Sequence, residues 1–474
     1  MDIKPNIKLF NTLSRETEKF APIKDGKVGL YLCGPTVYDY ATIGNYRTYI
    51  FGDLINRIFS YNGYKVKYVQ NITDVGHLVS DEDTGEDKLE KGARREGKTA
   101  REVADYFTKL YWAESDKLNI KRPTISCRAT DHIPEQIEMI KTLEEKGFTY
   151  KTSDGIYFDT SKQKDYGKLA TLDIKGLKEG ARVEANPEKK NITDFALWKF
   201  SPKNENRHME WEPPWGIGFP GWHIECSAMS IKYLDEPFDM HAGAVDLIPV
   251  HHTNEIAQNE AIYGHKTVNY WLHGGFLMVD GKKMGKSLGN AYKISDITDK
   301  GFDPLVFRYL TFNTHYRQPM NFTWEAIESS KEALSKLYKT VAKMLPNEDD
   351  RPKLSTEWGD KFLEAINDDL NMPKALAVVW ELVKNDSVDS STKLATLYKF
   401  DEVLGLDIKK YATNLSELMT QDSKLPEIVD RIKLERDVAR QKKDWQKSDK
   451  LRRNIEALGY RVEDIDGETK IYKI

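Results

Sequence analysis

Two lysines in the segment Lys283-Met284-Gly285-Lys286-Ser287 flank a short centre that contains a glycine. Positive side chains held in this way can stabilise the negative charge that develops on a leaving pyrophosphate, which lowers the reaction barrier without a covalent step on the protein. The small residues would allow the segment to close over a polyphosphate. The segment therefore favours nucleotide activation, although most lysine-rich turns are only solvated surface.

A second segment, upstream of the lysines, has the pattern of a nucleotide-binding turn. An apolar run ends at Leu32-Cys33, is broken by Gly34-Pro35, and is followed by Gly44 at the start of an amphipathic stretch. We predict a strand, a turn and a helix, in which Gly44 lets a nucleotide approach the N-terminus of the helix. An ordinary turn between a strand and a helix is the alternative interpretation.

Four side chains that suit zinc are scattered along the chain. His251 and Glu255 stand four residues apart, which places an imidazole and a carboxylate on one face of a helix. The thiolates of Cys33 and Cys226 would complete a set of four ligands. The set lacks the close spacing of a zinc finger, so cysteines that only pack and a simple histidine–glutamate hydrogen bond are the alternative.

Length and composition limit the class of protein. The 474 residues are enough for roughly two to four domains. A formal net charge of −4 argues against a generally basic surface, so any RNA contact should come from local patches. Three cysteines are too few for a disulfide framework and suit a reducing compartment. Because no apolar run has the length of a signal segment or a membrane span, we expect a cytoplasmic protein without membrane association.

The order of patterns predicts an α/β fold with a helical C-terminal part. Residues 27–75 read as a strand, a helix and a strand, and this pattern returns from 237 to 280. The stretch from about 77 to 200 reads as an insertion into a Rossmann-like nucleotide-binding domain. Both phosphate-type segments would fall beyond the carboxyl ends of the parallel strands, where such folds bind ligands. From about residue 323 the pattern is mostly helical, with residues 346–352 as a linker or turn.

The last part of the chain is locally basic. Residues 431–453 contain ten Lys or Arg against four Asp or Glu, and Trp445 lies among them. A pair of basic helices with an aromatic residue could follow an RNA backbone and stack on a base, whereas a solvated helix surface is the alternative. If this region contacts RNA, the candidate residues are Arg436, Arg440, Trp445 and Arg452.

The phosphate-type segments resemble the two signature motifs of class I aminoacyl-tRNA synthetases. Residues 221–230 (GWHIECSAMS) and 251–258 (HHTNEIAQ) are similar to the metal-site segments of the cysteinyl-tRNA synthetase family. The resemblance covers nearly the whole chain, in order and in spacing, and includes the C-terminal tail. It is therefore far more specific than either motif alone.

The resemblance implies an enzyme that uses ATP to convert L-cysteine to cysteinyl-adenylate and then transfers it to the 3′ end of tRNA(Cys). One Zn²⁺ per chain, held by Cys33, Cys226, His251 and Glu255, would select the substrate thiol, and Mg²⁺ would accompany ATP. Because zinc binds a thiolate and not a serine hydroxyl, an editing site would be unnecessary. We expect the enzyme to be a monomer.

The resemblance also implies roles for single residues and boundaries for the domains. Lys283 and Lys286 would stabilise pyrophosphate, and Thr42 and Asn45 would act at the first motif. The implied substrate and ATP contacts are Gly34, Gly44, Thr73 for the amino acid, Trp222 as a wall of the side-chain pocket, Asp246 for adenosine, and Ser287. The implied domains are a catalytic domain at 1–322 with its lysine loop at 283–287, a helical bundle at 323–410 and an anticodon-recognition region at 411–474.

Three residues depart from the family pattern. Thr42 stands where relatives usually carry histidine, Asn45 replaces a second histidine, and Gly285 replaces a serine. Threonine offers one neutral hydroxyl to a phosphate, and glycine loosens the loop. These changes keep open an impaired paralogue that binds tRNA or zinc. A ligase with an amino-sugar acceptor is the other hypothesis, which the long tail disfavours. Residues 86–95 match the family's persulfide-forming motif poorly, so that activity is not expected.

Overall fold

The computed structural model describes residues 6–76, 97–171, 186–202, 207, 209–285, 288–345, 353–423, 426–465 and 468–473. The chain forms two compact units, which we describe separately. The first unit comprises Met1–Leu334 with Pro352–Asp407, and the second comprises Ser335–Arg351 with Ile408–Ile474. None of the helices in the described ranges is long and apolar enough to cross a membrane.

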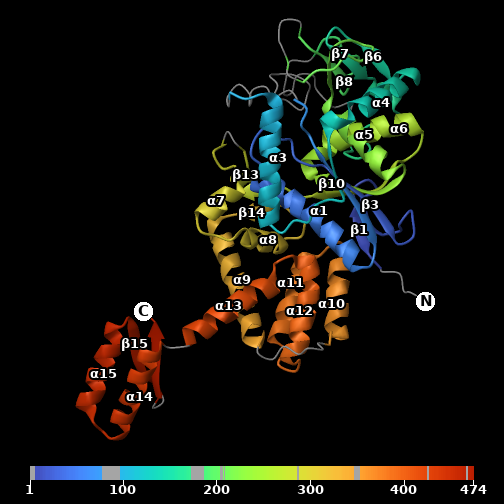
Figure 1. Cartoon of the computed structure of the whole chain (residues 1–474). Helices are drawn as coiled ribbons and strands as arrows, with labels where there is room; N and C mark the ends of the chain where they lie inside the picture. The colour runs from blue at the N-terminus through green and yellow to red at the C-terminus, as the bar shows by residue number, and fades with distance from the viewer. Residues whose placement is uncertain are drawn as a thin grey trace. The chain divides into compact units, whose positions relative to one another are not determined.

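A five-stranded parallel sheet organises the first unit, and its strands β3 and β10 are labelled in Figure 1. The strand order is β11-β10-β3-β4-β5. The strands are β3 (Lys27–Leu32), β4 (Lys65–Ile72), β5 (Ile125–Arg128), β10 (Phe238–Ala244) and β11 (Val268–Gly274). Every neighbouring pair is parallel, as expected where helices connect the strands. This sheet confirms the predicted Rossmann-like α/β fold.

Helix α1 (Ile43–Tyr61) connects β3 to β4, as the sequence pattern predicted. Thr42 caps it, because its side chain accepts from the Asn45 N–H while the Asn45 side chain accepts from the Thr42 N–H. Gly52 faces the sheet, and a Cβ there would lie 2.3 Å from Leu32 Cδ2. A glycine inside a helix usually costs stability, but here it allows α1 to approach β3.

A four-stranded antiparallel sheet, in the order β6-β7-β8-β9, lies between β5 and β10 in the sequence. Its strands are β6 (Thr149–Lys151), β7 (Gly155–Phe158), β8 (Phe195–Phe200) and β9 (Gly218–Pro220). Helices α3 (Ala100–Lys117) and α4 (Ile133–Glu145) precede it. The range expected for the insertion, about 77–200, contains β5, which pairs in register with β4. The structure therefore starts the antiparallel insertion near residue 149 and ends it near 220.

The first unit has several smaller elements. Helix α5 (Trp222–Leu234) precedes β10 in the sequence, and helix α6 (Thr253–Tyr263) follows it. The others are β1 (Lys8–Asn11), β2 (Glu16–Lys19), η1 (Ala129–His132), η2 (Thr160–Lys162), η4 (Val245–Leu247), η5 (Ile248–His252), β12 (Leu277–Val279), β13 (Lys282–Lys283), α7 (Ile294–Asp299), α8 (Pro304–Phe312) and β14 (Met320–Phe322).

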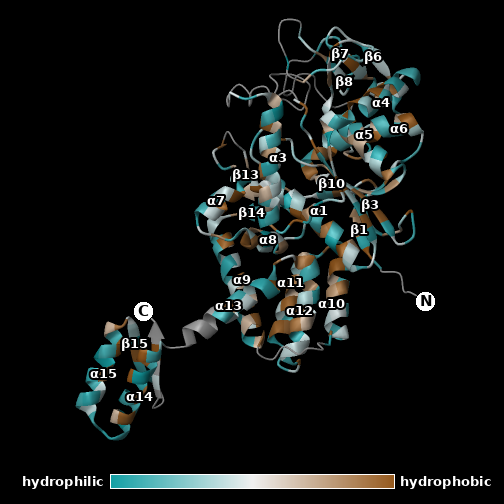
Figure 2. Ribbon diagram, in the orientation of Figure 1, coloured by the Kyte–Doolittle hydropathy of each residue, from teal (hydrophilic) through white to brown (hydrophobic). Residues whose placement is uncertain are grey.

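Helices dominate the chain from α9 (Trp324–Met344) onward, which confirms the pattern expected from about residue 323. In the first unit, α10 (Thr356–Asn367), α11 (Met372–Lys384) and α12 (Ser390–Leu404) pack against one another. Figure 2 shows hydrophobic residues along α11 and α12. Their packing includes the rings of Phe362 and Phe400, which stack with centroids 4.0 Å apart.

The second unit is built from helices and one hairpin. Its elements are α13 (Ile408–Ser423), α14 (Glu427–Gln441), α15 (Trp445–Ala457), β15 (Tyr460–Ile465) and β16 (Glu468–Lys473). The two strands are antiparallel. Val429, Ile455 and Val462 form a small buried core between α14, α15 and the hairpin.

One buried carboxylate joins α1 to the end of α12. Asp53 accepts from Arg57 Nε at 2.7 Å and from Arg308 Nη2 at 2.6 Å. Arg57 also donates to the Glu402 carbonyl, and Arg308 donates to the Leu404 carbonyl. Burial alone would raise the pKa of Asp53, but the two guanidinium groups outweigh it and lower this pKa.

We predict that Asp53→Asn lowers the free energy of unfolding by about 3–5 kcal/mol, because two buried guanidinium groups lose their shared carboxylate. A lowered pKa in the fold means that Asp53 stabilises the protein at pH above its unfolded value of about 3.9. This contribution is lost as the pH falls through the lower folded value. Thermal unfolding of the variant should therefore depend less on pH in the acid range than that of the parent protein.

Asp116→Asn is the matched control, because Asp116 pairs with Arg122 at 2.6 Å on the exposed surface. We expect a change of roughly 0–1 kcal/mol for this variant. Equal destabilisation by the two substitutions would contradict the importance assigned to the buried cluster.

Candidate active site and metal centre

A cavity of about 330 Å³ lies at the carboxyl ends of β3, β4 and β10. This is the edge where parallel α/β sheets bind ligands. Nine of the residues singled out from the sequence line it: Cys33, Gly34, Thr42, Asn45, Thr73, Trp222, Cys226, Asp246 and His251. The structure therefore brings residues from distant parts of the sequence to one site.

The N-terminus of α1 forms one wall of this cavity. Asn45 Oδ1 accepts from the Thr42 N–H and from the Thr42 hydroxyl, both at 2.9 Å. The Thr42 hydroxyl oxygen also accepts from the Asn45 N–H at 3.4 Å. With Oδ1 engaged in this way, Asn45 has its Nδ2 group to offer a ligand in the cavity. The pair thus combines a helix cap with one neutral donor.

The predicted zinc ligands converge at the cavity. The Sγ atoms of Cys33 and Cys226, a ring nitrogen of His251 and a carboxylate oxygen of Glu255 all lie within 4.8 Å of one another. Cys33 directly follows β3, Cys226 lies on α5, His251 on η5 and Glu255 on α6. Glu255 Oε1 is buried 3.1 Å from His251 Nε2, yet it receives no well-directed hydrogen bond. Two sulfurs, an imidazole and an unsatisfied carboxylate oxygen fit zinc.

The surroundings shift the pKa values of these four donors in different directions. Burial raises the pKa of Cys33 well above its usual value, while a hydrogen bond with Cys33 lowers the pKa of Cys226 to about 6. Burial opposes protonation of His251, but Cys226 outweighs it and raises the pKa of His251 to about 10. Burial would also raise the pKa of Glu255, but His241 lowers it to about 2. A metal ion would replace the protons on Cys33 and His251.

Asn71 links two of the expected substrate contacts, and we did not predict this role from the sequence. Its Oδ1 accepts from the Gly34 N–H at 2.8 Å, and its Nδ2 donates to Thr73 Oγ1 at 3.0 Å. Gly34 must be glycine here, because a Cβ would lie 1.7 Å from the Asn71 carbonyl oxygen. The only sequence signal was that Asn71 stands two residues before Thr73.

The lysine segment lies beside the start of α1. Lys283 is exposed at the end of β13, and Met284 Cε lies 2.4 Å from the position of a Cβ on Gly44. Asn290 accepts from the Gly285 N–H at 2.9 Å and donates to the Lys283 carbonyl at 3.2 Å. Lys286 and Ser287 lie outside the described residues. The two phosphate-type segments are thus neighbours in the fold.

Arg47 fixes α1 to the base of this segment, a role that the sequence did not reveal. Its guanidinium donates to the carbonyls of Gly275 at 2.7 Å and Gln318 at 2.6 Å, and also to that of Phe276. Burial lowers the pKa of Arg47 to about 10, so it stays charged at neutral pH. Because Phe276 directly precedes β12, these bonds fix the point from which the β12–β13 hairpin extends.

Three buried histidines contact the predicted zinc ligands, and we did not predict these contacts from the sequence. His241 Nε2 lies 2.9 Å from Glu255 Oε2, His252 Nε2 lies 3.2 Å from Cys33 Sγ, and His223 Nδ1 lies 3.0 Å from His251 Nδ1. Such partners orient metal ligands and set their protonation. Two stand directly next to expected site residues, His223 after Trp222 and His252 after His251, which was the only available signal.

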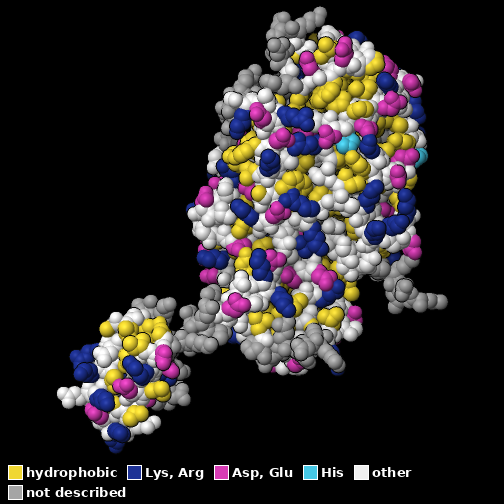
Figure 3. All heavy atoms as spheres, in the orientation of Figure 1, with side chains coloured by type: hydrophobic (Ala, Val, Ile, Leu, Met, Phe, Trp, Pro, Cys, Tyr) yellow, Lys and Arg dark blue, Asp and Glu magenta, His cyan; other side chains and the backbone are white. Residues whose placement is uncertain are grey.

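In the second unit the structure corrects one expected RNA contact. Arg436 is 1% exposed, and its guanidinium donates to Asp464 at 2.8 and 2.9 Å and to the Thr469 hydroxyl, so it is an internal ion pair. Trp445 is 57% exposed. Arg440 and Arg452 carry ion pairs with Asp464 and Glu456 at the surface. On the face shown in Figure 3, Lys and Arg alternate with Asp and Glu in both units.

Replacing Gly34 with alanine should destabilise the protein by about 1–3 kcal/mol, because the added methyl collides with the main chain at Asn71. Gly359→Ala is the control: nothing lies within 4 Å of a Cβ there, and Gly359 is inside α10. That substitution should stabilise by about 0.5–1 kcal/mol. Thermal unfolding of both variants tests the pair, and an unchanged Gly34→Ala protein would contradict the geometry at Asn71.

Comparison with known proteins identifies the family of the chain. Residues 19–332 match the family described as the tRNA synthetases class I (C) catalytic domain, and residues 361–409 match the DALR domain. The chain is 49% identical over 457 residues to cysteine–tRNA ligase 1 of Burkholderia lata, with 96% of this chain and 94% of that protein covered. It is 42% identical over 495 residues to the cysteine–tRNA ligase of Treponema denticola, with 99% and 100% covered.

Solved structures share the fold at low sequence identity. One is Mycobacterium tuberculosis methionyl-tRNA synthetase in complex with methionyl-adenylate, with a TM-score of 0.56, 16% identity, and 82% of this chain and 92% of that chain covered. Another is a LeuRS–tRNA–LeuAMS ternary complex from Agrobacterium radiobacter K84, with a TM-score of 0.59, 11% identity, and 84% and 86% covered. Together, the family match and the nearly full-length relatives establish that the chain belongs to the cysteine–tRNA ligase family of class I aminoacyl-tRNA synthetases.

Proposed function

We propose that this chain is a cysteine–tRNA ligase, which activates L-cysteine with ATP and transfers it to the 3′ end of tRNA(Cys). The observation that carries the proposal is one cavity that is lined both by three of the four zinc-type donors and by residues at the N-terminus of α1. The first can recognise a thiol and the second can receive phosphate oxygens. No observation on the described residues favours an impaired paralogue or an amino-sugar acceptor.

We assign the selection of cysteine to the part of the cavity that the zinc-type donors line. We propose one zinc ion per chain, held by Cys33, Cys226, His251 and Glu255. When bound there, zinc supplies a soft Lewis acid that takes a thiolate and rejects a hydroxyl. The Trp222 ring, 4.3 Å from the His251 ring, limits the space beside this group. Thr73, which Asn71 holds in place, is assigned to the amino-acid backbone.

Activation is assigned to the part of the cavity lined by Thr42 and Asn45. The Asn45 Nδ2 group and the start of α1 would receive phosphate oxygens, and Lys283 and Lys286 would stabilise the leaving pyrophosphate together with Mg²⁺. Gly44, Asp246 and Ser287 are assigned to ATP, and Gly34, which is hydrogen-bonded to Asn71, is assigned a backbone contact to the substrate. No side chain needs to form a covalent bond with the substrate. Positioning of the reactants within the cavity should therefore contribute most of the rate acceleration.

Transfer requires tRNA, which we assign to the C-terminal part. We propose a catalytic domain at 1–322, a helical domain at 323–410 and an anticodon-recognition region at 411–474. Trp445, Arg440 and Arg452 remain assigned to tRNA, since stacking and phosphate contacts need exposed groups. We further propose that the enzyme acts as a monomer in the cytoplasm.

ATP–pyrophosphate exchange tests the proposal directly. The metal-analysed protein should exchange pyrophosphate with cysteine and reject serine by a factor on the order of 10⁴ or more. Removing zinc with a chelator should abolish cysteine-dependent exchange, and restoring zinc should return it. Exchange that is absent in zinc-loaded protein, or equal with serine, would refute the proposed activity.

Asn45→Asp should separate the two roles of Asn45. Aspartate keeps the oxygen that accepts from Thr42, so the helix cap and the thermal stability should persist or rise slightly. It replaces the Nδ2 donor with a negative oxygen, so kcat/KM for ATP in the exchange reaction should fall about 10–100-fold, while KM for cysteine stays near the parent value. A variant with unchanged ATP kinetics would show that Asn45 only caps the helix.

A further inference from the structure

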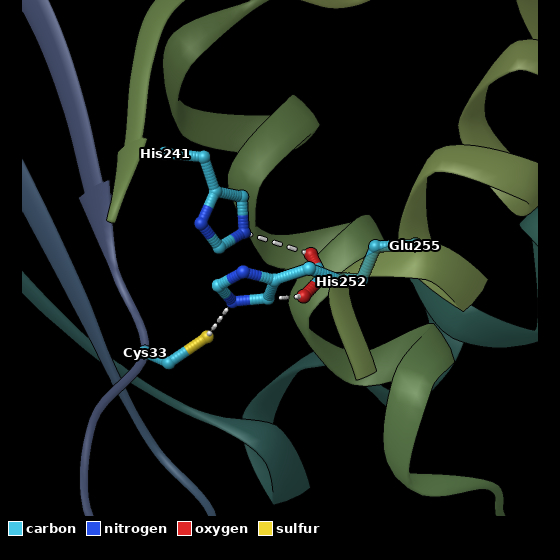
Figure 4. Close-up of side chains that lie close together, drawn as sticks. All are labelled: Cys33, His241, His252 and Glu255. Atoms are coloured by element: carbon cyan, nitrogen blue, oxygen red, sulfur yellow. Dashed lines mark hydrogen bonds and ion pairs between the residues drawn. The ribbon is translucent and has the colours of Figure 1, made fainter. Parts of the chain in front are cut away.

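Two overlapping groups of metal-type donors meet at the end of β3. The outer set is Cys33, Cys226, His251 and Glu255, to which we assigned zinc above. The inner set, drawn in Figure 4, is Cys33, His241, His252 and Glu255. In each set the four donor atoms lie within 4.8 Å of one another. The two sets share Cys33 and Glu255, so they cannot each hold an ion at the same time.

The inner donors already stand close to the spacing that zinc requires. Cys33 Sγ lies 3.2 Å from His252 Nε2, and His241 Nε2 lies 2.9 Å from Glu255 Oε2. Bonds of about 2.0–2.3 Å in a tetrahedral site place neighbouring donors roughly 3.3–3.6 Å apart. These two pairs therefore lie within a few tenths of an ångström of that spacing, and His252 Nε2 lies 4.0 Å from Glu255 Oε1. One sulfur, two imidazoles and one carboxylate make a complete set for zinc.

The fold holds His252 ready for this role. Its Nδ1 lies 2.7 Å from His273 Nε2, and His273 Nδ1 lies 2.8 Å from Thr12 Oγ1. When His252 donates from Nδ1 to His273, the lone pair on Nε2 points toward Cys33, as a ligand requires. Gly243 makes room for the ring, because a Cβ there would lie 2.7 Å from His252 Cε1.

The two sets differ in their access to the cavity. Cys33, Cys226 and His251 line it, so an ion in the outer set can meet a substrate. His241 and His252 are 0% exposed, and neither belongs to the cavity lining in the described part of the chain. Both sets supply four protein ligands, but only the outer one borders the cavity, where a zinc ion can expand its coordination to take a substrate atom.

We propose that Cys33 and Glu255 can hold zinc in two alternative positions: the outer one at the cavity and a closed inner one completed by His241 and His252. The inner position keeps the ion when Cys226 is not available as a ligand, and it holds the ion away from the substrate thiol. The proposal rests on the zinc site proposed above, because the two sets share two ligands.

Paired variants without Cys226 test this inference. In Cys226→Ala protein, adding His251→Ala leaves the inner set whole, whereas adding His252→Ala breaks it. We expect the first double variant to keep about one zinc per chain after dialysis against a chelator, and the second to lose it. With Cys226 present the order should reverse, so that His251→Ala weakens zinc binding more than His252→Ala. X-ray absorption should count one sulfur in Cys226→Ala/His251→Ala protein and two in the parent protein.

Any other pattern in the two double variants overturns the inference, including equal loss or equal retention of zinc. Thermal unfolding checks that each variant is folded. If the alanine variants do not fold, Cys226→Ser with His251→Asn or His252→Asn repeats the comparison with smaller changes in volume, since serine is a poor zinc ligand. A parent protein without zinc would instead refute the zinc site proposed above, so the two failures are distinguishable.

Discussion

The parallel pairing of β3 with β10 is the constraint on which the rest of the site depends. Leu32 pairs with Ala242, so the chain leaves both strands at the same edge of the sheet. The Cys33 N–H still donates to the Ala242 carbonyl, at 3.2 Å, which holds the first thiol where the strand ends. Because successive side chains on a strand alternate in direction, a slip of one residue would turn His241 away from Glu255. The register therefore fixes the metal donors and the cavity together.

Helix α1 connects the expected nucleotide side of the cavity with the rest of the first unit. It begins at the Thr42–Asn45 cap and holds the base of the lysine hairpin through Arg47. It contacts the end of α12 through Arg57, which pairs with Asp53. Each of these contacts is made by a side chain on one continuous helix. The cavity wall, the hairpin and the helical part of the first unit are therefore positioned relative to a single rigid element, which suits catalysis by positioning.

Much of the fold could be predicted from the sequence, because it follows from local patterns. The βαβ order around α1, the strands near residues 238–274 and the helices after residue 323 have clear periodicity. The spacing of His251 and Glu255 favoured a shared helical face, and the resemblance to the family then identified them, with Cys33 and Cys226, as the predicted zinc ligands. β5 was missed because a four-residue strand inside a long polar stretch gives little signal. The contacts of Asn71 with Gly34, of Arg47 with Gly275 and of His241 with Glu255 join residues 14 or more positions apart, so no local spacing predicts them. The RNA contact expected of Arg436 fails for the same reason, because its partner Asp464 lies 28 residues away.

Zinc content of Glu255→Gln protein tests the central claim most directly. Glutamine keeps the volume of the side chain but removes the carboxylate that both donor sets require. After dialysis against a chelator, the parent protein should hold about one zinc per chain, and the variant should hold almost none while remaining folded. A folded variant that keeps its full zinc content would show that Glu255 is not a ligand, and it would contradict the metal centre on which the account of thiol selection rests.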